Sequence, residues 1–111
     1  MNYIVFDLEW NQCPYGKGQE NERIPFEIIE IGAVKLNSER QIIDQYQVLI
    51  QPRVYKKLHH RTREIIQMDM KLLEREGIPF YRAVKHFLKW CGEDALFCCW
   101  GNSDLLELQR N

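Results

Sequence analysis

The stretch Tyr3-Ile4-Val5-Phe6-Asp7-Leu8-Glu9-Trp10 carries the signal on which the fold prediction depends. Its first four residues are β-branched or aromatic and have no helical period, so they predict a buried strand over residues 3–6. Asp7 and Glu9 come directly after this strand. Because side chains alternate along an extended backbone, residues two positions apart point to the same face. The two carboxylates are therefore expected side by side.

Two more strands are expected downstream, over residues 27–36 and 41–50. The turn residues between them, Asn37-Ser38-Glu39-Arg40, predict a hairpin. The polar segment 11–25 contains two prolines and two glycines, which is typical of a surface loop. This loop is expected to connect the first strand to the hairpin.

Helices are expected in the second half of the chain. Residues 61–76 predict two helical pieces, with Asp69 as the N-cap of the second and Gly77 as its stop. A third helix follows, because apolar residues recur at helical spacing between Pro79 and Gly92. Its apolar stripe consists of Phe80, Ala83, Val84, Phe87, Leu88 and Cys91.

The last expected strand is the continuously apolar run from Ala95 to Trp100, which is typical of a central strand buried on both faces. A further helix begins near Asp104. Three antiparallel strands followed by a helical crossover into a strand parallel to the first predict an α/β fold, a mixed sheet with flanking helices. A chain of 111 residues is expected to form one domain, residues 1–111, with one core.

Composition excludes several classes of protein. The formal net charge is -1, with 45% hydrophobic and 28% charged residues, as in globular domains. No apolar run approaches the ~20 residues that a membrane-spanning helix needs. Residues 1–7 lack the basic flank of a signal peptide, so a cytoplasmic location is expected. The four cysteines form no C-x-x-C pair, which favours reduced thiols over a metal or disulfide framework.

A third carboxylate, Asp104, is expected near Asp7 and Glu9. If strand 95–100 runs parallel to the first, the next helix begins at the carboxyl end of the sheet, where ligands collect in open α/β folds. Like charges held together repel, and Mg²⁺ or Mn²⁺ relieves that repulsion. Simpler interpretations remain: Asp7 and Glu9 as solvated surface acids, and Asp104 as a helix N-cap paired with Glu107.

Three runs of sequence resemble the first two motif regions of the DEDD 3′-5′ exonucleases. They are Phe6-Asp7-Leu8-Glu9-Trp10-Asn11-Gln12, Glu27-Ile28-Ile29-Glu30-Ile31-Gly32-Ala33-Val34-Lys35-Leu36 and Trp100-Gly101-Asn102-Ser103-Asp104. The branch most similar to this chain is the group around histone-mRNA 3′-exonucleases and bacterial sporulation-inhibitor exonucleases. The resemblance follows the whole chain in order and implies a ribonuclease-H-like fold.

The resemblance also implies an activity, the metal-dependent hydrolysis of phosphodiester bonds at nucleic-acid 3′ ends. In such enzymes four acids hold two Mg²⁺ or Mn²⁺ ions. Asp7 would bridge both ions, Glu9 would bind the ion that carries the attacking water, and Asp104 would support the second ion. The fourth acid and the general base, a His or a Tyr, belong to a third motif beyond Asn111. The chain is therefore expected to be the N-terminal part of a longer domain, with little activity alone.

Substrate contacts are expected from basic and aromatic side chains. All charges in residues 53–63 are positive, and Arg61 and Arg63 could contact the phosphates of a single-stranded 3′ end, RNA or DNA. A solvated, charged connection explains this stretch equally well. Trp10 could stack on the terminal base or pack in the core.

Two further expectations concern partners. An incomplete sheet would leave apolar surface exposed, which favours self-association. The alternative to an enzyme is a non-catalytic remnant of the same fold that binds nucleic acid or protein.

Overall fold

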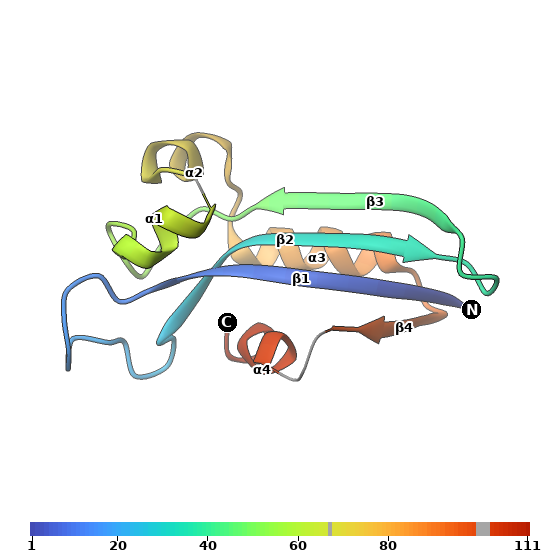
Figure 1. Ribbon diagram of the computed structural model, residues 1–111, viewed down its shortest axis with the longest axis horizontal. Helices are drawn as coiled ribbons and strands as arrows, with labels where there is room; N and C mark the ends of the chain where they lie inside the picture. Colours follow the sequence, from blue (N-terminus) through green and yellow to red (C-terminus); the bar gives the residue numbers. More distant parts are fainter. Residues whose placement is uncertain (67, 100–102) are drawn as a thin grey trace.

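The computed structural model describes residues 1–66, 68–99 and 103–111 (Figure 1). Its elements, in chain order, are β1 (Asn2–Gln12), β2 (Phe26–Leu36), β3 (Ile42–Leu49), α1 (His60–Ile66), α2 (Met70–Glu76), α3 (Phe80–Cys91), β4 (Ala95–Cys98) and α4 (Ser103–Arg110). The predicted hairpin is confirmed, as are the two short helices before Gly77. Asp69 is the N-cap of α2, and its side chain accepts a hydrogen bond from the backbone of Leu72.

The strands of the described residues form one mixed sheet in the order β3-β2-β1-β4. β2 is antiparallel to both β1 and β3, whereas β4 runs parallel to β1. In Figure 1, α3 lies behind the sheet and α4 lies below β1, beside β4. This is the α/β arrangement that the sequence predicts, including the parallel fourth strand.

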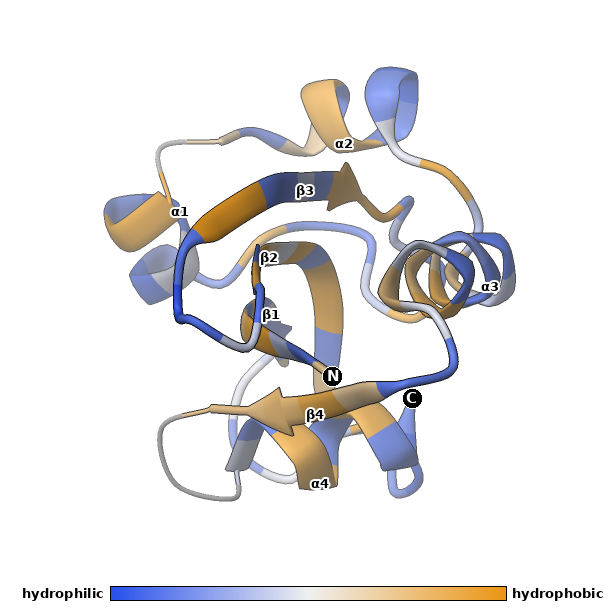
Figure 2. Cartoon of the chain, turned by 90° about the vertical axis from the view of Figure 1, so that its right-hand side faces the viewer, coloured by the Kyte–Doolittle hydropathy of each residue, from blue (hydrophilic) through white to orange (hydrophobic). Residues whose placement is uncertain are grey.

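The main core lies between one face of the sheet and α3. Ile4, Phe6 and Leu8 alternate along β1 toward this core, and the ring of Phe87 in α3 packs against Phe6. Figure 2 shows hydrophobic residues on the side of α3 turned toward the strands and hydrophilic residues on the side turned away. Leu88, predicted as part of the apolar stripe, is instead 53% exposed. It follows Phe87 by one position, which rotates it about 100° around the helix, away from the sheet.

A β-bulge in β2 sends one residue to the opposite face of the sheet. Glu9 pairs with Glu30 and Trp10 pairs with Ile28, so Ile29 is the extra residue. Ile29 is fully buried in a second hydrophobic cluster with Leu58 and Leu73. Partly buried residues of α1 and α2 complete that cluster. The segment that carries these two helices therefore covers one end of the face that α3 leaves open.

Two buried polar side chains fasten this segment to the sheet. Glu27 accepts hydrogen bonds from the backbone N–H groups of residues 53–55, at 2.8 to 3.2 Å. Asn11 donates to the carbonyl of Lys57 at 3.0 Å and accepts from the N–H of His59 at 2.8 Å. Because buried polar groups are costly without partners, these bonds fix where the segment lies. They place α1 directly beside β1.

β1 is longer than predicted. It extends from Asn2 to Gln12, so Asp7 and Glu9 lie within the strand and not after it, and the connecting loop begins at Cys13. The reason is the partner strand: β2 pairs with β1 as far as Gln12 and extends the strand through its polar residues.

The prediction of a central, doubly buried strand over 95–100 is wrong. β4 spans Ala95–Cys98, and Leu96 and Phe97 are 48% and 45% exposed. Among the strands described, β4 has β1 on one side and no neighbour on the other, so it is an edge strand. Figure 2 shows this hydrophobic strand below the other strands of the sheet, with α4 beneath it. Trp100, the last residue of the predicted strand, lies outside the described residues, as do Gly101 and Asn102.

Two expectations from composition can be compared with the fold. The structure holds no disulfide bond among the described residues. The helices of the described segments are all too short and too polar to traverse a lipid bilayer.

Replacing Phe87 by alanine should lower the free energy of unfolding by about 3 to 5 kcal/mol, because the ring is 1% exposed and its loss leaves a cavity in the main core. Lys85→Ala, on the exposed side of the same helix, should change it by less than about 0.5 kcal/mol. Urea denaturation followed by circular dichroism measures both. Equal losses from the two variants would contradict the orientation of α3.

Glu27→Gln should lower the free energy of unfolding by about 1 to 3 kcal/mol, because three backbone N–H groups lose a charged acceptor. The NH₂ group of the new glutamine side chain is a hydrogen-bond donor, so it cannot accept from these N–H groups. Glu39→Gln, which removes the same charge from the exposed turn between β2 and β3, is the control and should be neutral. The same denaturation experiment applies. A neutral Glu27→Gln variant would show that residues 53–55 do not depend on this side chain.

Candidate functional site

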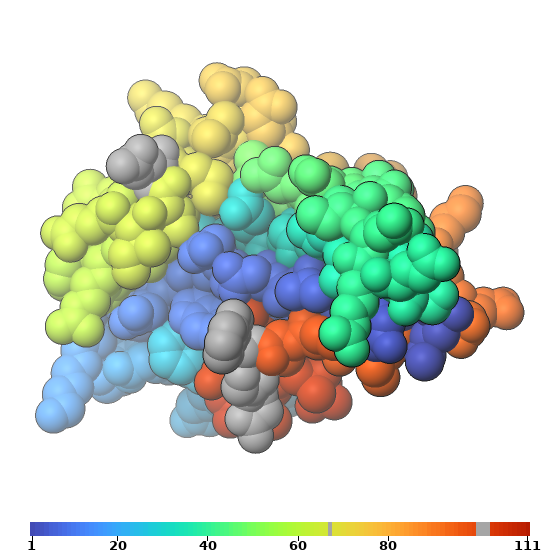
Figure 3. All heavy atoms as spheres, turned by 45° about the vertical axis from the view of Figure 1, so that its right-hand side comes forward, coloured from blue at the N-terminus to red at the C-terminus, as the bar shows by residue number. Residues whose placement is uncertain are grey.

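β1 presents Asp7 and Glu9 on the face of the sheet that α3 does not cover. Asp7 is exposed and lies opposite Gly32 of β2, which has no side chain to cover it. Glu9 lies opposite Glu30 and is half-buried. Figure 3 shows atoms of β1, in dark blue, at the surface between the α1 region in yellow-green and β4 in orange. The same-face placement predicted from the i, i+2 spacing is confirmed.

α4 brings Asp104 to the same part of β1. β4 pairs with β1 from Asn2 to Val5, and beyond that point the backbone N–H of Leu8 donates to Oδ2 of Asp104 at 3.3 Å. The Asp104 carboxyl group also lies close enough to that of Asp7 for the two to interact. The N-cap interpretation of Asp104 is not needed, because α4 begins at Ser103 and the carboxyl group of Asp104 is used across the fold, on β1.

Glu107, the expected capping partner of Asp104, serves a different contact. This residue is buried, and its Oε1 accepts a hydrogen bond from Arg110 at 3.1 Å. The ion pair lies within α4, one turn after Asp104. The alternative interpretation, a capping box of Asp104 and Glu107, therefore does not describe these contacts.

Burial and the neighbouring carboxylates raise the pKa values of Glu9 and Asp104. Burial raises the pKa of Glu9 most, and the charges of Asp7, Glu30 and Asp104 raise it further. Burial also raises the pKa of Asp104; the N–H of Leu8 opposes this rise, and the charge and hydrogen bond of Asp7 add to it. Acidic groups are thus concentrated on the open face of β1, and none of them belongs to an ion pair found in the described residues.

The donor set suits an oxygen-preferring divalent cation, since carboxylate oxygens are the usual ligands of Mg²⁺ and Mn²⁺. The neighbouring carboxyl groups of Asp7 and Asp104 fit such an ion, whose positive charge would offset their repulsion. The geometry is not that of a complete centre: no group of three His, Cys, Asp or Glu side chains in residues 1–66, 68–99 and 103–111 is arranged to hold a metal ion. The prediction that all three carboxylates lie within bridging reach of one another is not met within these described residues: Asp104 interacts with Asp7, while Glu9 acts on the site through its charge.

Glu30 is a member of the acidic group that sequence reasoning missed. It pairs directly with Glu9 across the two strands and accepts a hydrogen bond from Gln47 at 2.7 Å. Its position depends on the register between β1 and β2, which the sequence does not reveal.

The predicted substrate-contacting residues lie in three different places. Trp10 is on the opposite face of β1 from Asp7 and Glu9, where it packs against the main core and the ring of Phe26 at 6.0 Å. The core interpretation of Trp10 therefore fits its placement. Arg61 is exposed on α1. Arg63, also on α1, lines a large cavity beyond the end of β1.

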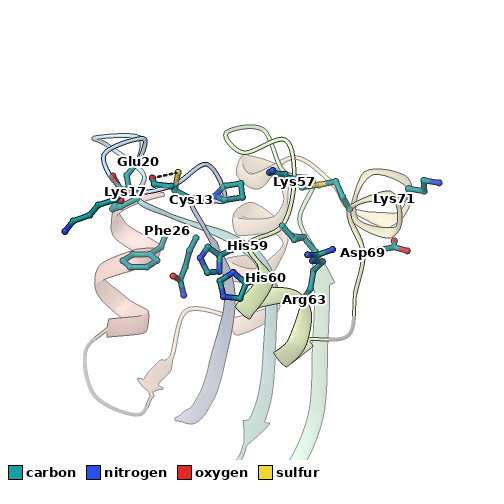
Figure 4. Close-up of a pocket in the computed structure, with 16 residues that line it drawn as sticks. Cys13, Lys17, Glu20, Phe26, Lys57, His59, His60, Arg63, Asp69 and Lys71 are labelled. Carbon is teal, nitrogen blue, oxygen red and sulfur yellow. Dashed lines mark hydrogen bonds between the residues drawn. The ribbon is translucent and has the colours of Figure 1, made fainter.

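This cavity, called the basic cavity below, has a volume of about 1000 Å³. Residues from the β1–β2 connection, from α1 with the segment before it, and from the start of α2 line it (Figure 4). Its ionisable lining residues are Cys13, Lys17, Glu20, Lys57, His59, His60, Arg63, Asp69 and Lys71. Only part of this cluster falls in the basic stretch 53–63 identified in the sequence.

Comparison with known proteins finds the fold and not a close relative. No family model and no curated protein sequence matches the chain. Among solved structures, the nuclease domain of 3′hExo, a DEDDh family member bound to rAMP, has a TM-score of 0.74 at 21% identity, over 97% of this chain and 57% of that one.

Two further structures show the same similarity. The 3′-exonuclease in a structure of 3′-end-specific recognition of the histone mRNA stem-loop has a TM-score of 0.73 at 21% identity, over 97% of this chain and 52% of that one. Cell-death related nuclease 4 has a TM-score of 0.73 at 15% identity, over 97% of this chain and 38% of that one. The chain spans about half the length, or less, of the structures it matches. It has the ribonuclease-H-like α/β fold of DEDD 3′-5′ exonuclease domains.

Proposed function

We propose that this chain forms part of a metal-dependent 3′-5′ exonuclease that hydrolyses phosphodiester bonds at single-stranded nucleic-acid 3′ ends. The observation that carries the proposal is the approach of Asp104 on α4 to β1 beside Asp7, with Glu9 on the same open face of that strand. Support comes from the fold, because the structures that share it include a nuclease domain bound to rAMP and a 3′-exonuclease that recognises an mRNA 3′ end.

The residues of this site have distinct tasks in the proposed reaction. A bound Mg²⁺ or Mn²⁺ would polarise the phosphodiester and activate water for attack. Asp7 and Asp104 would hold the cation through their facing carboxyl groups. The N–H of Leu8 orients the Asp104 carboxyl group by its hydrogen bond. Asp7 is exposed, so a strand end can approach it from solvent, and Glu9 is held at the side of the site, beside α1.

The proposed reaction needs more than the three acids, since the resemblance implies a fourth acid and a general base. The three histidines do not lie with the acids: His59 and His60 line the basic cavity, and His86 is exposed on α3. We therefore propose that the chain supplies the first half of a site that a longer domain completes.

The chain is expected to bind Mn²⁺ through Asp7 and Asp104, because a cation relieves their repulsion. Asp7→Asn and Asp104→Asn should each weaken binding about tenfold or more, as loss of a supporting ligand typically does. Titration followed by electron paramagnetic resonance measures free Mn²⁺ directly. Glu39→Gln, the matched control in the β2–β3 turn, should bind as the unaltered chain does. Equal affinity in all four proteins would contradict a metal role for the two acids.

In the absence of metal, Asp7→Asn should raise the midpoint of thermal unfolding, because the variant removes a negative charge beside Asp104 and offers an amide donor to its carboxyl group. A gain of about 0.5 kcal/mol corresponds to roughly 2 to 4 °C for a domain of this size. Calorimetry in EDTA measures the midpoint. In saturating Mn²⁺ the unaltered chain should have the higher midpoint of the two proteins. A lower midpoint in EDTA would mean that Asp7 stabilises the apo fold.

A protein extended to the length of the similar nuclease domains should trim a 5′-labelled single strand from its 3′ end in Mn²⁺, and Asp7→Asn should abolish this. The 111-residue chain alone should show little or no trimming, because loss of the general base costs a factor of roughly 10² to 10⁴. Gel analysis of product lengths is the measurement. Trimming by the short chain at the same rate would contradict the division of the site, and binding without trimming by the extended protein would favour a non-catalytic remnant.

A further inference from the structure

The basic cavity gathers cationic side chains from segments far apart in the sequence. Lys17 comes from the β1–β2 connection, Lys57 precedes α1, Arg63 belongs to α1 and Lys71 to α2. Figure 4 shows Lys17 and Lys71 at opposite sides of the cavity with their ammonium groups directed outward, and His59 and His60 between the two lysines. The fold, and not the local sequence, therefore creates this concentration of positive charge.

The charge of the basic cavity is not neutralised within the described part of the chain. Its cations appear in none of the ion pairs found there. The cavity also contains two acids, Glu20 and Asp69, and the Asp69 carboxylate already accepts the N–H of Leu72 at 2.8 Å. Four permanent cations against two acids leave an excess of positive charge, which attracts an anionic ligand.

The basic cavity offers flat rings as well as charge. The imidazoles of His59 and His60 stack with their centroids 4.3 Å apart, and Phe26 also lines the cavity. Desolvation lowers the pKa of His59, with further contributions from His60 and Arg61, which favours the neutral ring. Aromatic and imidazole rings stack on nucleic-acid bases, whereas a free phosphate ion has no base that could stack on them. Cations interleaved with rings are typical of a surface that binds single-stranded nucleic acid.

The basic cavity and the acidic site lie along the same strand but do not overlap. Cys13, at the cavity, follows Glu9 by four residues, which is about 13 Å along an extended strand. α1 stands between them: Ile65 and Ile66 face the Glu9 side, while His60 and Arg63 line the cavity. A ligand that reaches both places must be a chain several nucleotides long.

We propose that the basic cavity binds the sugar-phosphate backbone of a single-stranded nucleic acid, at nucleotides upstream of the 3′ end held at Asp7 and Asp104. Lys17, Arg63 and Lys71 contact phosphates, and His59, His60 and Phe26 offer stacking surfaces. Only the assignment of the upstream direction rests on the proposed function; the binding itself does not require catalysis.

The test is a titration of the chain with a fluorescent dodecathymidylate, read by anisotropy in EDTA at several salt concentrations. The variant Lys17→Gln/Arg63→Gln/Lys71→Gln removes three exposed cations of the cavity. The matched control, Arg82→Gln/Lys85→Gln/Lys89→Gln, removes one arginine and two lysines from exposed positions of α3. Circular dichroism confirms that both variants keep the fold.

The cavity variant should lose about tenfold or more in affinity, and the slope of log affinity against log salt should become shallower by about 2, as expected for three lost phosphate contacts on a single strand. The control should keep both values. Equal losses in the two variants would overturn the proposal, as would inorganic phosphate competing as strongly as the oligonucleotide, because the cavity would then be a small-anion site.

The upstream direction has its own measurement, made with the extended protein. The cavity variant should raise KM for a dodecanucleotide and leave KM for a dinucleotide unchanged, since a dinucleotide is too short to reach the cavity from Asp7. Equal changes for both substrates would overturn the direction. If the extended protein does not trim at all, the proposed function fails while the salt titration still decides the binding site.

Discussion

The parallel pairing between β4 and the first residues of β1 is the constraint on which the candidate site depends. β4 covers β1 only as far as Val5, and the chain then continues into α4. The next available N–H on that edge, at Leu8, is thereby left to the carboxyl group of Asp104. A longer β4 would occupy this edge of β1 and carry the start of α4 away from Asp7. The shortness of β4 is thus what brings acids almost one hundred residues apart into one site.

A second constraint, the bulge at Ile29, places positive charge near these acids. The bulge turns Ile29 toward the cluster of Leu58 and Leu73, and the buried Glu27 and Asn11 then hold the basic segment against the sheet. The open face of β1 consequently has an acidic centre flanked by a cationic cavity. The proposed substrate, an anionic chain cleaved at its end, would use both: positive charge for the backbone, and carboxylates that gather metal ions at the end.

Local patterns were enough to predict much of this fold, whereas features that depend on pairing were not predictable. The spacing of Phe80, Ala83 and Phe87 identifies α3, because helical periodicity can be recognised within a few turns of sequence. The i, i+2 spacing of Asp7 and Glu9 places the two on the same face of β1. The local sequence cannot show that pairing with β2 extends β1 beyond Phe6, through Asp7 and Glu9. Nor can it reveal the bulge at Ile29, which exists only as a register between two strands. An apolar run such as 95–98 is compatible with a central or an edge strand, because composition does not encode the number of neighbours.

The most direct test of the account is nuclear magnetic resonance of the ¹⁵N-labelled chain with small additions of Mn²⁺, which broadens the signals of amides near the ion. The account predicts that the amides around Asp7 and Leu8 in β1 broaden together with those of Asp104 and its neighbours in α4, before any others. Broadening of β1 without α4, or first at another acid such as Asp69, would contradict the central claim that the two elements share one cation site.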